Sequence, residues 1–211
     1  MREWNWMRYV LCLLAAAVLC GCGGGTKVVI KQENYAPAFR AGDFGRLKGK
    51  TVILDNFTNQ AANTKRSGYY SADNKFYYET TKNLESHIWY CFQKAFQHAG
   101  MKVYDQSYGY YGYHHPYHPY WWGYVPPPAR QQGAFKDAVE FQLVLTSMTD
   151  QECKFQVLLF RKGEEKFRKD YTVTLPAPSS QDPKELENNA YRLIDQMVAA
   201  VFRDKEFRKV F

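Results

Sequence analysis

Two stretches of this chain gather residue types that do chemistry, and the richer one runs from Gln106 to Ala129. It holds three His, seven Tyr, two Trp, three Gly and five Pro, and it has no charged residue. Neutral imidazole is a common ligand of copper, nickel and zinc. The sequence therefore offers a metal site made by His114, His115 and His118, although Pro116 and Pro119 restrict how the imidazoles converge.

The aromatic residues of the same segment suggest other functions. Amphipathic rings contact sugars or membrane interfaces, and Tyr and Trp often anchor protein interfaces. The candidates for such contacts are Tyr117, Tyr120, Trp121 and Trp122. A loop of this composition without any specific ligand is equally compatible with the residues. Metal binding, surface or partner contact, and no ligand thus all remain open.

The second stretch is Leu19-Cys20-Gly21-Cys22, which ends an apolar run that begins at Tyr9 behind a basic head. That run is too short to span a bilayer, so it predicts a secretory signal. Its last four residues resemble the bacterial lipobox, with Leu at −3, a small Gly at −1 and then cysteine. The resemblance implies a diacylglyceryl group on the Cys22 thiol, cleavage before Cys22, and acylation of the new amino group with a fatty acid such as palmitate.

The lipobox resemblance also predicts a location and partners. Two or more acyl chains hold a protein stably on a membrane. Lipoproteins kept in the inner membrane often carry Asp after the lipidated cysteine, whereas this chain has Gly23. We therefore expect an outer-membrane lipoprotein that faces the periplasm, with the inner membrane as the alternative. The expected partners are the membrane and an envelope protein, and export excludes nucleic acid.

Composition and the remaining motifs favour a binding protein over an enzyme. Without the signal the chain keeps 26 basic and 20 acidic side chains, a charge of +6 that suits an acidic partner or surface. No motif indicates a nucleophile, an acid–base pair or a cofactor. A peptidoglycan or lipid hydrolase with scattered catalytic groups is the rival interpretation.

Cys91 and Cys153 are the only thiols of the mature chain besides the lipidated one. Cys91 is predicted on the core face of a helix and Cys153 on the core face of a strand. An oxidising compartment would favour a disulfide between them. Two isolated buried thiols are the alternative.

The chain divides into three parts. Residues 1–21 form the signal and residues 22–50 the lipidated cysteine and a tether. That tether could include a short strand over 27–30 and take a compact route across the domain. Residues 51–211 form one domain that carries the aromatic insert 106–129.

Within the domain, apolar periodicity predicts the secondary structure. We expect a strand at 51–55, a loop at 56–74, a helix from Tyr77 to about Ala99, a strand at 101–104, three antiparallel strands over 138–175 and a terminal helix after Asp182. His87 and His98 fall toward the polar side of the first helix, which predicts solvated or capping histidines.

These elements predict an α+β fold, a two-layer α/β sandwich with a mixed sheet of about five strands in the order β-α-β-β-β-α and two helices on one face. Behind a lipobox, this order resembles envelope lipoproteins of the YajG type, auxiliary lipoproteins of ABC transporters and the amino-terminal domain of TolB. The segments 52–57 and 202–207 most resemble the YajG type. The resemblance implies a non-enzymatic accessory role in an envelope assembly or transport system.

Overall fold

The computed structural model describes residues 26–105 and 138–211, so Cys22 and the insert 106–129 lie outside the described residues. In chain order the elements are β1 (Thr26–Ile30), η1 (Gln32–Asn34), η2 (Ala41–Leu47), β2 (Thr51–Asn59), β3 (Thr64–Lys65), β4 (Gly68–Tyr70), β5 (Phe76–Thr80), α2 (Leu84–His98), β6 (Lys102–Asp105), β7 (Val139–Met148), β8 (Glu152–Arg161), β9 (Glu164–Thr174), α4 (Pro183–Arg203) and α5 (Lys205–Lys209). Within these two stretches, no helix has both the length and the apolar character needed to cross a bilayer.

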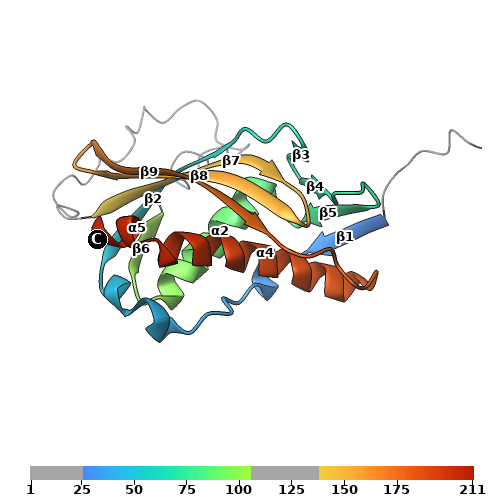
Figure 1. Ribbon diagram of the computed structural model, residues 1–211, viewed down its shortest axis with the longest axis horizontal. Coiled ribbons are helices and arrows are strands. Elements are labelled where there is room, and N and C mark those ends of the chain that lie inside the picture. Colours follow the sequence, from blue (N-terminus) through green and yellow to red (C-terminus); the bar gives the residue numbers. More distant parts are fainter. Residues whose placement is uncertain (1–25, 106–137) are drawn as a thin grey trace, which may run out of the picture.

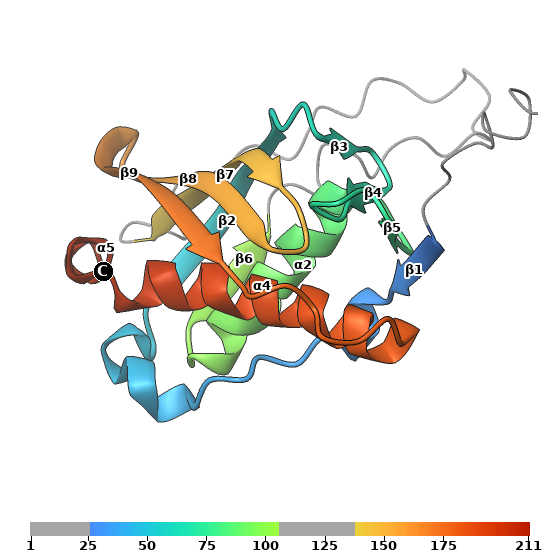
Figure 2. The same ribbon diagram turned by 45° about the vertical axis from the view of Figure 1, so that its right-hand side comes forward.

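The larger sheet has five strands in the order β6-β2-β7-β8-β9. β2 runs parallel to β6 and β7, and β7, β8 and β9 form an antiparallel meander. The helices α2 and α4 cover one face of this sheet (Figures 1 and 2). The predicted two-layer arrangement with a mixed sheet is thus confirmed.

Local signals in the sequence set the ends of both long helices. The Asn83 side chain caps α2 by accepting a hydrogen bond from the Ser86 amide at 2.6 Å. Gly100 follows α2 with φ +81°, a conformation that glycine adopts without strain. Asp182 caps α4, and Pro183 takes the first helical position. A backbone N–H at that position has no acceptor within the helix, so proline fits there without the loss of a hydrogen bond.

The core lies between the sheet and the two helices. Alternate residues of the meander point inward, and Phe141 and Phe155 are among the fully buried ones. The ring of Phe96 on α2 lies 5.1 Å from that of Phe141 on β7 and 5.0 Å from that of Phe202 on α4. These contacts join both helices to the sheet through one aromatic cluster.

A second sheet, in the order β1-β5-β4-β3, shows that two expectations were wrong. The range 56–74 is not one loop, because β2 continues to Asn59 and β3 and β4 follow. Tyr77 lies in β5, and α2 begins only at Leu84. Close packing holds this small sheet together, since a β-carbon at Gly68 would lie 1.9 Å from the Tyr78 carbonyl oxygen.

Residues 26–50 take the compact route across the body. β1 pairs in parallel with β5 and buries Val28 and Ile30. The chain then runs from β1 at one end of the molecule to η2 at the other (Figure 1). There Phe44 and Leu47 are buried, and the Phe44 ring lies 5.2 Å from that of Phe202. The described part of the expected tether therefore belongs to the folded core.

Candidate functional site

The structure places only two of the residues selected from the sequence as site candidates. Cys91 and Cys153 are buried, and both are free thiols, so the structure contains no disulfide between them. The others lie outside the described residues: Cys22, His114, His115, His118, Tyr117, Tyr120, Trp121 and Trp122.

His87 contradicts the expectation of a solvated histidine, because only 3% of its surface is exposed. Its side of α2 is covered by α4 and by the chain around η1. The imidazole stacks with the Tyr191 ring, with a centroid distance of 6.4 Å. His98, in contrast, is exposed, and its Nε2 lies 2.9 Å from the Phe39 carbonyl oxygen.

His87 and Cys91 form a buried pair one helical turn apart, with 3.9 Å between Nε2 and Sγ. Burial lowers the pKa of His87 to about 4. Burial, followed by the charge of Asp195, raises the pKa of the Cys91 thiol well above its usual value. Both groups are therefore neutral at neutral pH, whereas nucleophilic cysteine chemistry needs a thiolate. This pair is built as part of the core.

The segment after β1 is fastened to α4 by a set of polar contacts that we name the N-terminal clasp. Glu187 Oε1 accepts hydrogen bonds from the Lys31 amide at 3.2 Å and from Asn34 Nδ2 at 3.1 Å. The Tyr191 hydroxyl lies 2.6 Å from the Lys31 carbonyl oxygen and 2.5 Å from Glu187 Oε1. Tyr35 donates its hydroxyl to Asp195 Oδ1 at 2.9 Å.

Tyr35 and Asp195 form the more buried part of the clasp. Tyr35 is 3% exposed, and desolvation together with the Asp195 charge raises the pKa of its hydroxyl. Desolvation also raises the pKa of Asp195, while the hydrogen bonds from Tyr35 and the Ala38 amide oppose that shift. The hydrogen bond between the two side chains is thus formed in a partly dehydrated place, where it is hard to replace by water.

The sequence reasoning missed the clasp, although a signal for it exists. The three α4 residues Glu187, Tyr191 and Asp195 recur every four positions, so they share one helix face. That face lies beside the apolar stripe of α4. Two carboxylates and a tyrosine at this spacing predict a polar docking edge, but they do not reveal what docks there.

Asp150 joins the small sheet to the rest of the body. It is 2% exposed, and its Oδ1 accepts a hydrogen bond from the Ala72 amide at 2.9 Å. Its Oδ2 lies 3.4 Å from the Tyr78 hydroxyl, and its carbonyl oxygen accepts from Asn189 Nδ2 at 3.1 Å. One residue of the β7–β8 turn therefore bonds the small sheet and α4.

The end of the body opposite β1, which we call the far end, holds the β8–β9 turn and α5 (Figure 1). A pocket of about 320 Å³ opens there, lined by Arg161, Lys166, Phe167, Glu206, Lys209 and Val210. Lys166 pairs with Glu164, and Lys209 Nζ lies 2.7 Å from Glu206 Oε1. Arg161 Nε is buried and has no hydrogen-bond partner among the residues that the structure describes.

Four exposed cations form a basic rim at the same end, around the starts of β2 and β6. The Lys102 amide donates to the Lys50 carbonyl oxygen at 2.8 Å, which brings the two loops together. No rim residue makes an ion pair with another residue that the structure describes. The rim consists of Arg46, Lys48, Lys50 and Lys102.

Among residues 26–105 and 138–211, no three His, Cys, Asp or Glu side chains lie close enough together to hold a metal ion. The predicted histidine ligands all fall in the insert. The metal interpretation therefore stays a prediction about residues 114–118.

Comparison with known proteins finds one similar solved structure to report. No protein-family model matches the sequence, and no curated protein matches it. A crystal structure of a Xanthomonas campestris protein, described as a member of the family DUF330, resembles this chain with a TM-score of 0.48 and 8% sequence identity. The match covers 87% of this chain and 96% of that protein.

Proposed function

We propose that this chain is a membrane-anchored lipoprotein of the bacterial envelope, lipidated at Cys22, whose folded body is a non-enzymatic accessory or binding component facing the periplasm. The outer membrane is the proposed location, because Gly23 follows the cysteine. The observation that carries the proposal is the short distance in sequence between the lipobox cysteine and the folded body.

β1 starts at Thr26, four residues after Cys22. Four residues of extended chain reach at most about 14 Å, so a lipid on Cys22 keeps the β1 end close to the bilayer. Four residues are too few for a flexible tether that would let the body move far from the membrane. The folded body of such a lipoprotein therefore stays at the membrane surface.

The N-terminal clasp supports the same function mechanically. The chain that leaves β1 is bonded to Glu187 and Asp195 on α4, so the anchor is coupled to the longest helix of the described residues. The far end lies opposite β1 (Figure 1), and it carries the basic rim and the pocket beside Arg161. We propose that the far end receives an acidic envelope partner, because unpaired cations attract such a surface.

Replacing Cys22 with serine tests the anchor. In the proposed function Cys22→Ser stops the incorporation of labelled fatty acid and moves the protein out of the detergent-extracted membrane fraction. Cys20→Ser is the matched control, and it should keep both the label and the membrane location. Continued labelling of Cys22→Ser, or loss of labelling in Cys20→Ser, would show that the lipidation site is wrong.

Crosslinking in intact cells tests the accessory role. A protein crosslinked reproducibly to the wild type, but not to a variant with the basic rim reversed to glutamate, supports the proposed binding function. Turnover of peptidoglycan or phospholipid by the purified protein would contradict it and favour the hydrolase.

A further inference from the structure

The small sheet has two unlike faces. Its inner face buries Tyr69 and Tyr78, whose rings stack 5.1 Å apart. The outer face carries the alternate residues of β1, β4 and β5 and the adjoining β3. Its residues are Lys27, Val29, Lys65, Tyr70, Tyr77 and Glu79.

Lysine and tyrosine interlock on this outer face. Lys65 Nζ donates a hydrogen bond to the Tyr70 hydroxyl at 2.8 Å. The same ammonium lies 4.9 Å from the centroid of the Tyr70 ring and 5.6 Å from that of Tyr77, and the two rings are 4.9 Å apart. The hydrogen bond to Tyr70 raises the pKa of Lys65, so the cluster keeps its positive charge. It presents apolar ring surface and a cation side by side.

The surroundings of this cluster contain charges of both signs, with cations in excess, and one apolar residue. Val29 is 43% exposed and is one of two large exposed apolar residues among those described. Lys27 pairs with Glu79, and Lys75 lies 2.8 Å from Asp73. Lys65 and the neighbouring Arg66 make no ion pair with a described residue, so the face has an excess of positive charge.

Tyrosine rings, lysine and an exposed aliphatic side chain together match the chemistry of a phospholipid headgroup region. Tyrosine is enriched where a membrane meets water, because its ring is apolar and its hydroxyl is polar. Lysine and arginine are attracted to the phosphates of anionic lipids. An acidic partner protein could bind a face anywhere on the body. A face that contacts lipid must lie close to the lipidated cysteine, as this one does.

We propose that the outer face of the small sheet lies on the headgroups of the membrane that holds Cys22, with Lys65 and Arg66 toward lipid phosphates. This inference rests on the proposed function, because the lipid is what brings the sheet to the surface. β1 belongs to this sheet and begins four residues after Cys22, so the sheet cannot lie far from the bilayer. The anchor and the sheet then fix the orientation of the body together.

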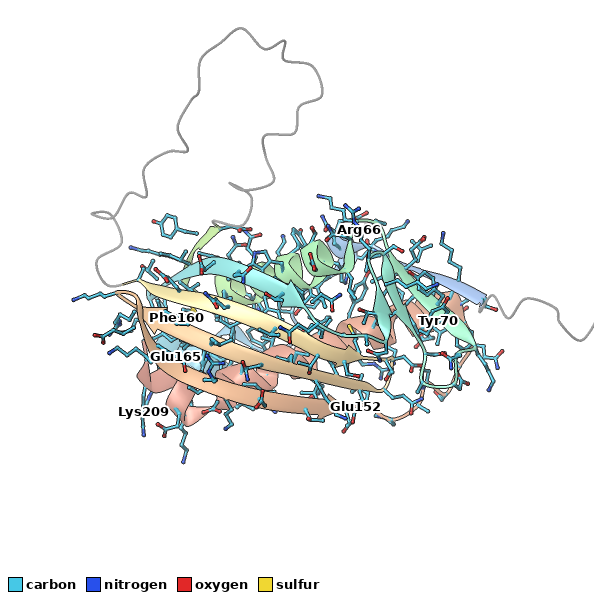
Figure 3. The ribbon with its side chains drawn as sticks, turned by 90° about the horizontal axis from the view of Figure 1, so that it is seen from above. Arg66, Tyr70, Glu152, Phe160, Glu165 and Lys209 are labelled. Carbon is cyan, nitrogen blue, oxygen red and sulfur yellow. The ribbon has the colours of Figure 1, made fainter. Side chains whose placement is uncertain are left out.

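Spin labels on single introduced cysteines test the contact in the lipidated full-length mature protein. The Cys22 thiol carries the lipid and the other two thiols are buried, so only the introduced cysteine reacts. Val29→Cys and Lys75→Cys place labels at the small sheet, and Glu165→Cys places the matched control at the other end. Figure 3 shows the separation, with Tyr70 and Arg66 at one end and Glu165 and Lys209 at the other.

The protein is reconstituted in vesicles of phosphatidylethanolamine with a minority of phosphatidylglycerol. The labels at residues 29 and 75 should collide less often with a water-soluble nickel complex than the label at residue 165, because the membrane shields them. Equal collision rates at all three positions would overturn the proposal. Fatty acid on Cys22, measured by mass on the same samples, decides the proposed function separately.

Charge reversal tests the role of the phosphates. Lys65→Glu combined with Arg66→Glu should restore collisions at the residue 29 label, while Lys166→Glu combined with Lys209→Glu at the far end should not. A label at 29 that stays protected in the first double variant would overturn the assignment of these two cations to lipid phosphates.

Discussion

The N-terminal clasp, together with Asp150, and the basic rim use their charged groups in opposite ways. The carboxylates of Asp150, Glu187 and Asp195 accept hydrogen bonds from segments far away in the sequence. At the far end, the basic rim around Lys50 and Lys102 is exposed and makes no ion pair within the described part of the chain. The clasp and Asp150 thus fasten segments of the body together, whereas the rim cations remain available for binding. Substitutions in the clasp or at Asp150 should change stability, and substitutions in the rim should change binding.

The largest effect should come from Tyr35→Ala in the clasp. The variant removes a buried ring that lies 6.0 Å from the Tyr191 ring, and it takes a donor from Asp195. Truncating a large buried aromatic side chain costs about 3–5 kcal/mol of the free energy of unfolding. Urea unfolding measures this loss.

Tyr35→Phe is the matched control, because it keeps the ring and removes only the hydroxyl. Its cost should be about 1 kcal/mol, the usual value of one hydrogen bond. If both variants were as stable as the wild type, the clasp would not fasten residues 31–38 to α4.

The second effect concerns pH and depends on His87. Its pKa is about 4 in the folded protein and 6.5 as the ordinary value. Above pH 6.5 the imidazole is neutral in both the folded and the unfolded state, so its titration does not change the free energy of unfolding. As the pH falls from 6.5 toward 4, the imidazole takes up a proton in the unfolded chain but not in the folded protein. The free energy of unfolding therefore falls by about 3 kcal/mol in total. Below pH 4 this contribution stays constant.

His87→Phe should remove that part of the pH dependence, because phenylalanine keeps a planar ring at this buried position and cannot be protonated. Denaturant unfolding at a series of pH values measures it, and His98→Gln is the exposed control that should keep the wild-type slope. The same slope in His87→Phe and the wild type would contradict the assignment to His87.

Much of the fold could be predicted from the sequence, because its signals are local. The meander from Val139 to Thr174 alternates apolar and polar residues with a period of two, and Asp182 and Asn83 are helix caps that act within one turn. The long helix itself was expected too early. Tyr77 extends its apolar pattern in sequence, although β5 uses that residue in strand pairing.

The small sheet and the buried state of His87 could not be predicted in this way. The strands β3, β4 and β5 have two to five residues, and adjacent tyrosines such as Tyr69 and Tyr70 hide the alternation between faces. His87 is polar by its position on α2, and it is buried by the chain near η1, more than 50 residues earlier in the sequence. Helical periodicity within α2 cannot show that a segment far away in the sequence covers His87.

A smaller stability effect is expected at Asp150, which joins the β7–β8 turn to the small sheet. Asp150→Ala removes the acceptor of the Ala72 amide and the contact with the Tyr78 hydroxyl, and a hydrogen bond of this kind contributes about 0.5–1.5 kcal/mol. Asp170→Ala is the control, since Asp170 is exposed and its side chain accepts a hydrogen bond from Gln156 Nε2 on the sheet surface. Thermal unfolding should separate the two variants, and equal melting temperatures would mean that the junction adds no stability.

The smallest change in stability, and the clearest change in binding, is expected in the basic rim. Lys48→Glu and Lys50→Glu together alter exposed side chains that make no ion pair with another described residue, so the free energy of unfolding should change by no more than about 0.5 kcal/mol. The crosslinked envelope partner should nevertheless be lost, because two attractive charges become repulsive. Lys154→Glu is the control, because Lys154 is not part of the rim and already pairs with Glu152 at 2.9 Å. Crosslinks of this variant should persist. A double variant that folds normally and keeps its partner would show that the rim does not bind, and the contrast between the two regions would then be one of stability alone.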